Sequence, residues 1–287
     1  MPKFFVVSDI HSYYTPLIEA LKSAGYDQNN PDHLLIVCGD IFDRGDESFK
    51  VLKFLKSIPR ERRILIRGNH EYLLRDAINR EKFYEHDYHN GTVKTITDLT
   101  GYDYYDSLIC PEFICEDFKG HKILEWIFSD EWQNYYETDN FIFVHSWIPL
   151  IAKDNLPAHY IHNRVFEYRE DWRNATDVEW EDATWGCPWI LQQQGLNKTG
   201  KTIVCGHWHC SDFHDHLPDD PIGIDGVDPR SENEIYFSKD IIALDACTAM
   251  TGFCNVLVIE GDQCYDQHNN PLPFSAFQEP DISLKEE

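Results

Sequence analysis

Seven short apolar runs, each bounded by turn-forming residues, lie along the chain. They are rich in β-branched and aromatic side chains, which is typical of buried strands. The runs are KFFVVSD, HLLIVCGD, RILIRGN, NFIFVHS, TIVCGH, IIALDAC and NVLVIEGD, beginning at residues 3, 33, 63, 140, 202, 241 and 255. Helical patterns follow the first three strands, at residues 15–25, 47–59 and 71–79. This alternation predicts a layered α/β fold, in which ligands bind at the carboxyl ends of the strands.

The first five predicted strands each end in a polar motif: SDIH, GDIFDRGD, RGNHE, VHSW and GHWH. A single motif of this kind has little specificity, because a lone Asp or Asn at a strand end is usually a turn or a helix cap. Five ordered sets of metal-ligand residue types, each directly after a strand, instead predict a metal site. The candidate ligands are Asp9, His11, Asp40, Asn69, His145, His207 and His209.

This mixture of carboxylate, imidazole and amide groups suits Mn²⁺, Fe or Zn²⁺ better than Ca²⁺ or a thiolate-bound metal. The number of candidate ligands predicts two ions that share a carboxylate, ~3.5 to 4 Å apart, and that lower the pKa of a bridging water. His214 and His216 could extend the site, but histidines of a polar surface loop are the simpler interpretation.

Taken in order, the motifs resemble those of the calcineurin-like metallophosphoesterases. Within them they are similar to the phosphoprotein phosphatase branch, which includes the phage lambda phosphatase and bacterial serine/threonine phosphatases. That branch carries GDxHG, GDxxDRG and RGNHE, then a later His after a strand and a GH motif. The similarity covers residues 7–209, and GDIFDRG and LIRGNHE are its most specific parts. It implies a metallophosphoesterase-type β-sandwich flanked by helices.

The resemblance also implies a role for each matching residue. The metal roles are Asp9 and His11 on the first ion, Asp40 as the bridging carboxylate, and Asn69, His145 and His207 on the second ion. The catalytic roles are His70 as the acid at the leaving oxygen, Asp43 as its orienting partner, and Arg44 and Arg67 as the phosphate clamp. A guanidinium suits that clamp because its fork binds two phosphate oxygens at once.

Two features depart from the branch. Ser8 and Ser12 stand where it usually has glycines, which affects the turn geometry but not the ligands. The GHWH motif carries a second histidine, His209, which is more typical of the wider superfamily and could add a ligand to the first ion.

The expected activity is hydrolysis of phosphate monoesters by direct attack of a metal-bridging hydroxide. The resemblance points to phosphorylated Ser or Thr in proteins, or to small phosphoesters, as substrates. A close sister group cleaves diadenosine tetraphosphate, so a nucleotide hydrolase is the first alternative. A non-catalytic scaffold with this fold is the second, although such proteins tend to lose the histidine acid or the metal ligands.

The rest of the chain is expected to complete a single domain over residues 1–287. Residues 159–199 are rich in Trp and acids with little periodicity, and predict an insertion that either shapes a substrate pocket or is simply a packed excursion. Residues 212–238 read as a long polar loop and 278–287 as a flexible tail. Cysteines in or beside the strands are expected to be reduced core residues; these are Cys38, Cys205, Cys247 and Cys254.

The net charge of the chain is −25, from 50 acidic and 25 basic residues. Such a charge repels nucleic acids and anionic membrane surfaces, so neither is expected as a partner. The chain has no apolar run of the ~20 residues that a spanning helix needs, and no signal-like start. We therefore expect a cytoplasmic protein; the sequence leaves its oligomeric state open.

Overall fold

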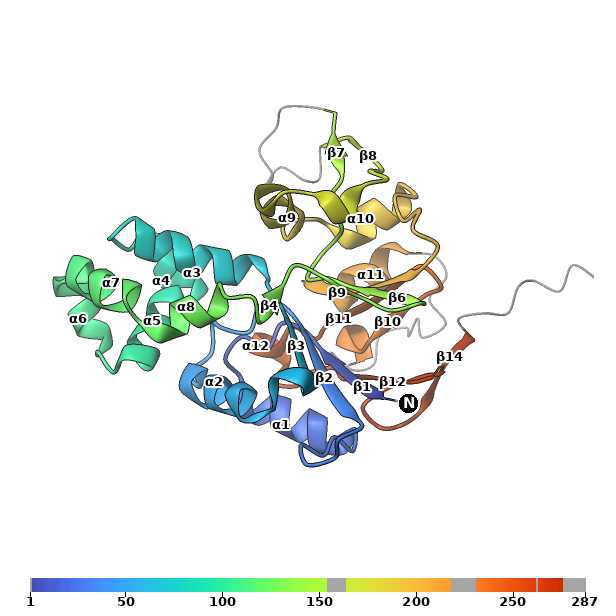
Figure 1. The fold of residues 1–287 in the computed structure, drawn as a ribbon, viewed down its shortest axis with the longest axis horizontal. Helices are drawn as coiled ribbons and strands as arrows, with labels where there is room; N and C mark the ends of the chain where they lie inside the picture. Colours follow the sequence, from blue (N-terminus) through green and yellow to red (C-terminus); the bar gives the residue numbers. More distant parts are fainter. Residues whose placement is uncertain (1, 154–163, 218–230, 262, 276–287) are drawn as a thin grey trace, which may run out of the picture.

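The computed structural model describes residues 2–153, 164–217, 231–261 and 263–275. Two main β-sheets form its centre, with helices on their outer faces (Figure 1). The predicted layered α/β sandwich is confirmed, and all seven predicted strands are present.

The larger sheet has the strand order β14-β13-β12-β1-β2-β3-β4. Its strands are β1 Lys3–Val7, β2 His33–Cys38, β3 Arg63–Ile66, β4 Trp132–Gln133, β12 Leu257–Glu260, β13 Gln263–Tyr265 and β14 Pro271–Ser275. Strands β1 to β4 are parallel, whereas β12 pairs antiparallel with β1 and continues into β13 and β14. Because β1, β2 and β3 are parallel, their carboxyl ends meet at one edge of the sheet.

The second sheet has the order β10-β11-β9-β6-β5. Its strands are β5 Tyr136–Glu137, β6 Phe141–Phe143, β9 Thr202–His209, β10 Tyr236–Phe237 and β11 Ile241–Asp245. Strand β9 lies between β6 and β11 and runs parallel to both. A separate two-stranded sheet pairs β7 Ile151–Ala152 with β8 Phe166–Glu167.

Alternating side chains of the strands fill different apolar layers. Val6 and Ile36 point between the two main sheets and pack with residues such as Val204. Their neighbours Val7 and Val37 belong to the cluster under the helices on the other face. Both faces of these strands are therefore buried, which explains their almost continuous apolar sequence.

The three predicted helices are confirmed as α1 Tyr14–Ser23, α2 Ser48–Ser57 and α3 Asn69–Asn79. A lobe of further helices lies between β3 and β4 and was not predicted; Figure 1 shows it at the left. Its members are α4 Glu85–Asn90, α5 Thr92–Thr100, α6 Tyr104–Ile109, α7 Pro111–Lys119 and α8 Lys122–Ile127. Three of them, α4, α6 and α8, have only six residues, so apolar periodicity in the sequence is a weak signal for them.

The Trp-rich region contains regular structure in its described part, although its sequence shows little periodicity. Residues 164–199 contain α9 Asp177–Ala183 and α10 Pro188–Gln193. Helix α9 begins with a capping box between Thr176 and Glu179, a signal that the sequence carried. Residues 154–163 lie outside the described residues.

The prediction of a polar loop at 212–238 needs a similar correction. Helix α11 Cys210–His216 occupies its beginning, because Phe213 is fully buried against the second sheet. The 3-10 turn Ser231–Asn233 and strand β10 occupy its end. Residues 218–230 and the predicted tail at 278–287 lie outside the described residues.

Candidate metal centre and active site

A cavity of about 270 Å³ opens where the carboxyl ends of the strands from both sheets meet. It is lined by His11, Asp40, Arg44, Asn69, His70, Leu73, Asn90, Trp185, His207, His209, Asp245, Cys247, Thr248, Ala249 and Met250. Seven of the predicted site residues are in this set, although they come from four separate motifs. The fold therefore brings most of the predicted site together.

The backbone at these strand ends is unusual. Asp9, His11, Asp40, Asp43 and His207 all have positive φ, between 49° and 73°. This left-handed conformation is unfavourable for residues other than glycine, and such strain is common at functional sites. It turns the chain sharply at the strand ends, where His11, Asp40 and His207 line the cavity.

Gly206 is required by the close approach of the two sheets next to Asp9. A Cβ atom at this position would overlap Asp9 Oδ2 and Ser8 Oγ. The same carboxylate accepts hydrogen bonds from Ser8 Oγ at 2.5 Å and from the His207 amide at 3.0 Å. The glycine thus permits the contact that connects the first motif to the last.

We expect Gly206→Ala to destabilise the protein by about 1 to 3 kcal/mol, the usual cost of overpacking, and to reduce its bound metal. Thermal unfolding and metal analysis measure both effects. Gly120→Ala is the control, because a Cβ there meets only Asp117 O at 3.9 Å. Equal stability and metal content in the two variants would contradict the packing role of Gly206.

Asp40 lies at the centre of the site and belongs to two groups of potential metal ligands. The groups found among the described residues are His11, Asp40 and His70, and Asp40, His145 and His207. Within each group the ligand atoms lie within 4.8 Å of one another. Asp40 is the one residue common to both groups, and its bridging role stays a prediction.

The donor atoms of the histidines fit cations. His145 Nδ1 donates a hydrogen bond to the Cys38 carbonyl oxygen at 2.9 Å, which leaves Nε2 of the neutral ring as an acceptor. That Nε2 atom lies 2.8 Å from Asn69 Oδ1 and 3.2 Å from His207 Nδ1. Lone-pair atoms this close together repel each other unless a positive ion lies between them. In addition, a hydrogen bond from the other ring nitrogen to the backbone is typical of metal-binding histidines.

His11 follows the same pattern on the other side of Asp40. Its Nδ1 atom donates to the Phe42 carbonyl oxygen at 3.1 Å, and its Nε2 atom lies 3.7 Å from Asp40 Oδ2. Burial, followed by the positive charges of His70 and Arg44, lowers the pKa of His11 well below its usual value. The ring is therefore neutral, as metal ligation requires.

The carboxylates of the site also favour cations. Burial, and then the charges of Asp245 and Asp40, raise the pKa of Asp9 well above its ordinary value. Several buried carboxylates at one place repel each other unless positive charge is bound between them. Asp9 itself is outside the two ligand groups, whereas Asp245, which sequence reasoning missed, lines the cavity. The sequence could have identified Asp245, because it lies at the end of the sixth predicted strand.

His70 and Asp43 form the pair that the sequence predicts. His70 Nδ1 lies 2.8 Å from Asp43 Oδ2, and both side chains are buried. Asp43 also accepts hydrogen bonds from the hydroxyl groups of Thr92 and Thr95 on helix α5. Burial alone would lower the pKa of His70, but Asp40 and Asp43 together raise it to about 8, so the imidazole is protonated at neutral pH.

Glu71 belongs to the RGNHE motif, but no role was predicted for it from the sequence. Its fully buried carboxylate accepts hydrogen bonds from the amides of Gly68, Asp40 and Ile41 at 2.7, 3.1 and 3.0 Å. Burial and the charge of Asp40 raise its pKa to about 8. Glu71 therefore holds the backbone of the second motif against the third.

A model of the calcineurin-like phosphoesterases matches residues 2–211 of the chain. The chain belongs to this family. The family prediction made from the motifs is confirmed. The two groups that share Asp40 are therefore candidate metal-binding sites of a phosphoesterase.

Individual relatives of this phosphoesterase are distant. A symmetrical bis(5'-nucleosyl)-tetraphosphatase of Marinomonas sp. is 31% identical over 67 residues, 23% of each chain. A cold-active protein-tyrosine phosphatase of a Shewanella species is 16% identical with a TM-score of 0.47, covering 95% of this chain and 80% of that one. A protein serine/threonine phosphatase from Saccharomyces cerevisiae is 15% identical with a TM-score of 0.46, covering 98% and 82%. This chain matches about a quarter of the length of the Marinomonas tetraphosphatase.

Two of the predicted clamp residues occupy different environments in this phosphoesterase. Arg44 lines the cavity, with its backbone amide bound to the Asn90 carbonyl oxygen. Arg67 does not line it. Its guanidinium donates to the carbonyl oxygens of Ile127 and Ser129 and packs over the Phe128 ring. The structure thus brings one arginine of the pair into the site, and the other holds the link between α8 and β4.

His209 and Cys247 lie beside each other in the cavity wall. The Cys247 side chain and Asp245 raise the pKa of His209 to about 9 against the opposing effect of burial. His209 is outside both ligand groups found among the described residues. Cys247 was predicted as a core residue and is instead partly exposed, because its left-handed backbone turns it into the cavity.

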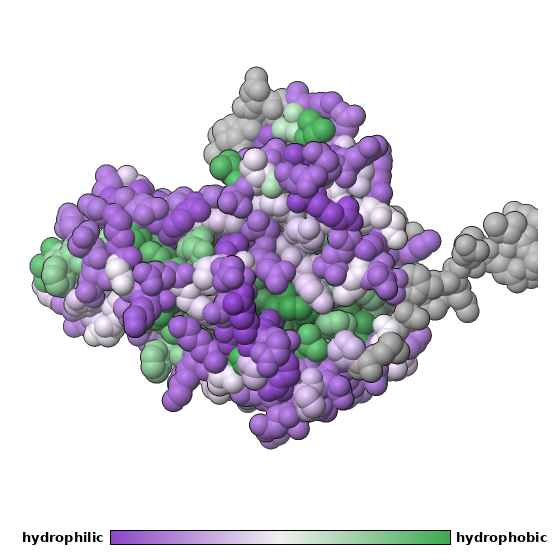
Figure 2. All heavy atoms as spheres, viewed as in Figure 1, coloured by the Kyte–Doolittle hydropathy of each residue, from purple (hydrophilic) through white to green (hydrophobic). Residues whose placement is uncertain are grey.

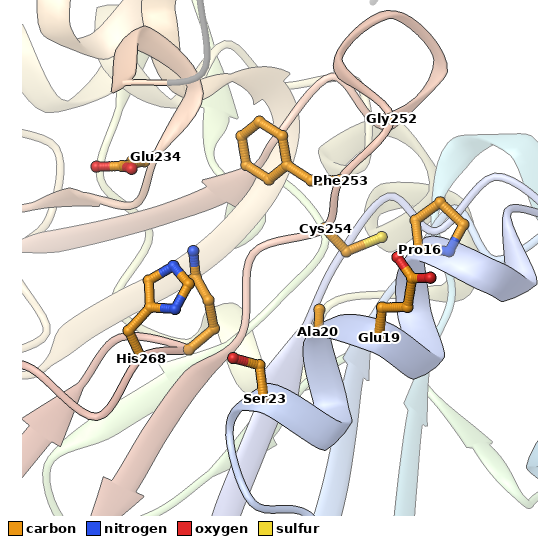
Figure 3. Close-up of a pocket in the computed structure, with 10 residues that line it drawn as sticks. Pro16, Glu19, Ala20, Ser23, Glu234, Gly252, Phe253, Cys254 and His268 are labelled. Carbon is orange, nitrogen blue, oxygen red and sulfur yellow. The ribbon is translucent and has the colours of Figure 1, made fainter. Parts of the chain in front are cut away.

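A second cavity, of about 250 Å³, lies between α1 and the segment that precedes β12 (Figure 3). Pro16, Ala20, Phe253, Cys254 and His268 are among its lining residues. It contains none of the predicted ligands or catalytic residues, so the site is the cavity at the strand ends. No helix in the described parts of the chain is long and apolar enough to cross a membrane.

Proposed function

We propose that this protein is a binuclear metal-dependent phosphatase that hydrolyses phosphate monoesters. The observation that carries the proposal is the position of Asp40, which belongs to both candidate ligand groups and lies beside the His70–Asp43 pair. A shared carboxylate next to a protonated imidazole supplies what phosphoester hydrolysis needs: two cation sites and a proton donor.

The residues that would hold the ions are those predicted from the motifs. Asp9 and His11 would hold one ion, and Asn69, His145 and His207 the other. Asp40 would contribute to both, and His209 would add a ligand to the first. When bound, two divalent ions supply Lewis-acid activation of water and of the phosphate. These nitrogen and oxygen ligands suit Mn²⁺, and Fe and Zn²⁺ are the alternatives.

The chain's own residues perform the remaining steps. His70 donates its proton to the leaving oxygen, and Asp43 keeps the imidazole charged and oriented. Arg44 binds the equatorial phosphate oxygens, where charge is held through the transition state. Leu73, Trp185 and Met250 form the apolar part of the cavity wall, which receives the leaving group.

Replacing Arg44 with Ala should reduce kcat/KM by ~10² or more with unchanged metal content, because a charge-assisted clamp is worth a few kcal/mol. Arg67→Ala is the matched comparison. Since its guanidinium binds backbone carbonyls, we expect it to lower thermal stability more than catalysis. Normal turnover in Arg44→Ala would remove that residue from the clamp.

The decisive experiment is a comparison of rates with Mn²⁺ on phosphoseryl and phosphotyrosyl peptides, diadenosine tetraphosphate and cyclic nucleotides. We propose phosphorylated proteins or small phosphoesters as substrates. Faster hydrolysis of diadenosine tetraphosphate than of any monoester would instead establish a nucleotide hydrolase, as in the Marinomonas relative. Absence of turnover on every substrate, with metal bound, would support a scaffold.

We also propose a cytoplasmic location. All nine cysteines are free, which suits a reducing compartment.

A further inference from the structure

Helices α6 and α7 present a cluster of large apolar side chains to solvent. Its members, which we call the lobe patch, are Tyr104, Tyr105, Leu108, Ile109 and Phe113, each between 54% and 65% exposed. The described residues contain eleven exposed large hydrophobic side chains, and five of them lie within these ten positions. Figure 2 shows green atoms gathered at this end of the helical lobe.

Packing within the chain does not account for the patch. The opposite sides of the two helices supply the buried contacts, through Ser107, Ile114 and Phe118. Within the patch, Tyr104 and Phe113 make edge-on ring contacts with Tyr88 and Tyr102 and stay more than half exposed. Single exposed apolar residues are ordinary, whereas a contiguous cluster marks an interaction surface.

Acidic residues flank the patch residues along the chain. They are Asp103, Asp106, Glu112, Glu116 and Asp117, and the chain has no Lys, Arg or His between residues 101 and 118. An acidic rim repels anionic membranes and nucleic acids. It also opposes a second copy of this chain, which would bring an equally acidic rim against it. The complementary partner has an apolar centre and basic flanks.

We propose that the lobe patch docks a basic amphipathic helix of another protein. Leu108, Ile109 and Phe113 receive its apolar face, and the surrounding carboxylates pair with its Lys or Arg residues. None of the patch residues lines the catalytic cavity, so a docked partner leaves the active site open. The patch thus recruits a substrate protein or a regulator to the lobe.

The test uses two synthetic helical peptides that share one leucine face and carry lysine or glutamate on the other. Fluorescence anisotropy should show binding of the lysine peptide and none of the glutamate peptide. The double variant Leu108→Ser, Ile109→Ser should weaken binding by at least ~10-fold, because it removes two buried apolar contacts at unchanged net charge. Phe113→Ser serves as a second, independent variant.

Val178→Ser is the matched control, since Val178 is an exposed apolar residue of similar accessibility that lies between two acids, on α9. Its binding should equal that of the unchanged protein. Equal binding by the lobe variants would overturn the proposal, as would a concentration-dependent dimer that the double variant abolishes. Turnover of p-nitrophenyl phosphate and the melting temperature verify folding, and the binding result does not depend on the proposed phosphatase activity.

Discussion

His70→Asn should slow hydrolysis of a phosphoseryl peptide by ~10² to 10⁴, the usual range for general acid catalysis. It should slow hydrolysis of p-nitrophenyl phosphate distinctly less. The reason is the leaving group: a serine alkoxide leaves poorly without a proton, whereas p-nitrophenolate leaves well. The protonated imidazole held by Asp43 is the group placed to supply that proton.

Metal content decides between the two roles open to His70, because it also belongs to one candidate ligand group. If it is the acid, His70→Asn keeps both ions. Equal losses on the two substrates together with a lost ion would make it a ligand instead. His86→Asn, at an exposed position on α4, controls for loss of a histidine in general.

Asp40→Asn should have an effect of similar or greater size, on the order of 10³ or more in kcat/KM, since metal ions contribute several kcal/mol to charge stabilisation. Asn is isosteric and retains an oxygen for the hydrogen bond that Asp40 Oδ1 accepts from the His70 amide. The loss therefore reports on the charge that holds the ions. Metal analysis should find at least one ion missing.

Thermal unfolding gives an independent measurement of the same change. Saturating Mn²⁺ should stabilise the unchanged protein, by about 2.7 kcal/mol at a hundred times the dissociation constant, and Asp40→Asn distinctly less. Asp130→Asn, an exposed acid paired with Arg60, should behave like the unchanged protein. Full occupancy of two ions in Asp40→Asn would exclude the bridging role.

The strand ends and their ligands could be predicted from the sequence because their signal is local. Asp9, Asp40 and Asn69 each come within three residues of the end of an apolar run, and parallel strands place such positions at one edge. Contacts between distant segments have no such signal. Thr92 and Thr95 on α5 reach Asp43 from positions 49 and 52 residues away.

The direction of Arg67 could not be predicted for a related reason. Its position within RGNHE is a local property, but the carbonyl oxygens of Ile127 and Ser129 that bind it end the helical lobe. The orientation of a long side chain follows from the acceptors that the rest of the fold provides. A sequence pattern thus locates a functional position more reliably than it locates the atoms at the end of the side chain.

The hydrogen bonds from Thr92 and Thr95 to Asp43 limit how this protein can be re-engineered. The helical lobe is inserted between the neighbouring strands β3 and β4, so it looks like a unit that could be exchanged. Nevertheless α5 binds Asp43, the partner of the proposed proton donor His70, and Gly91 packs directly against the backbone of Arg44. A chimaera that exchanges the lobe must therefore keep residues 90–95 of this chain. Otherwise the corresponding segment of the other protein must be transferred together with the Asp–His pair that it binds.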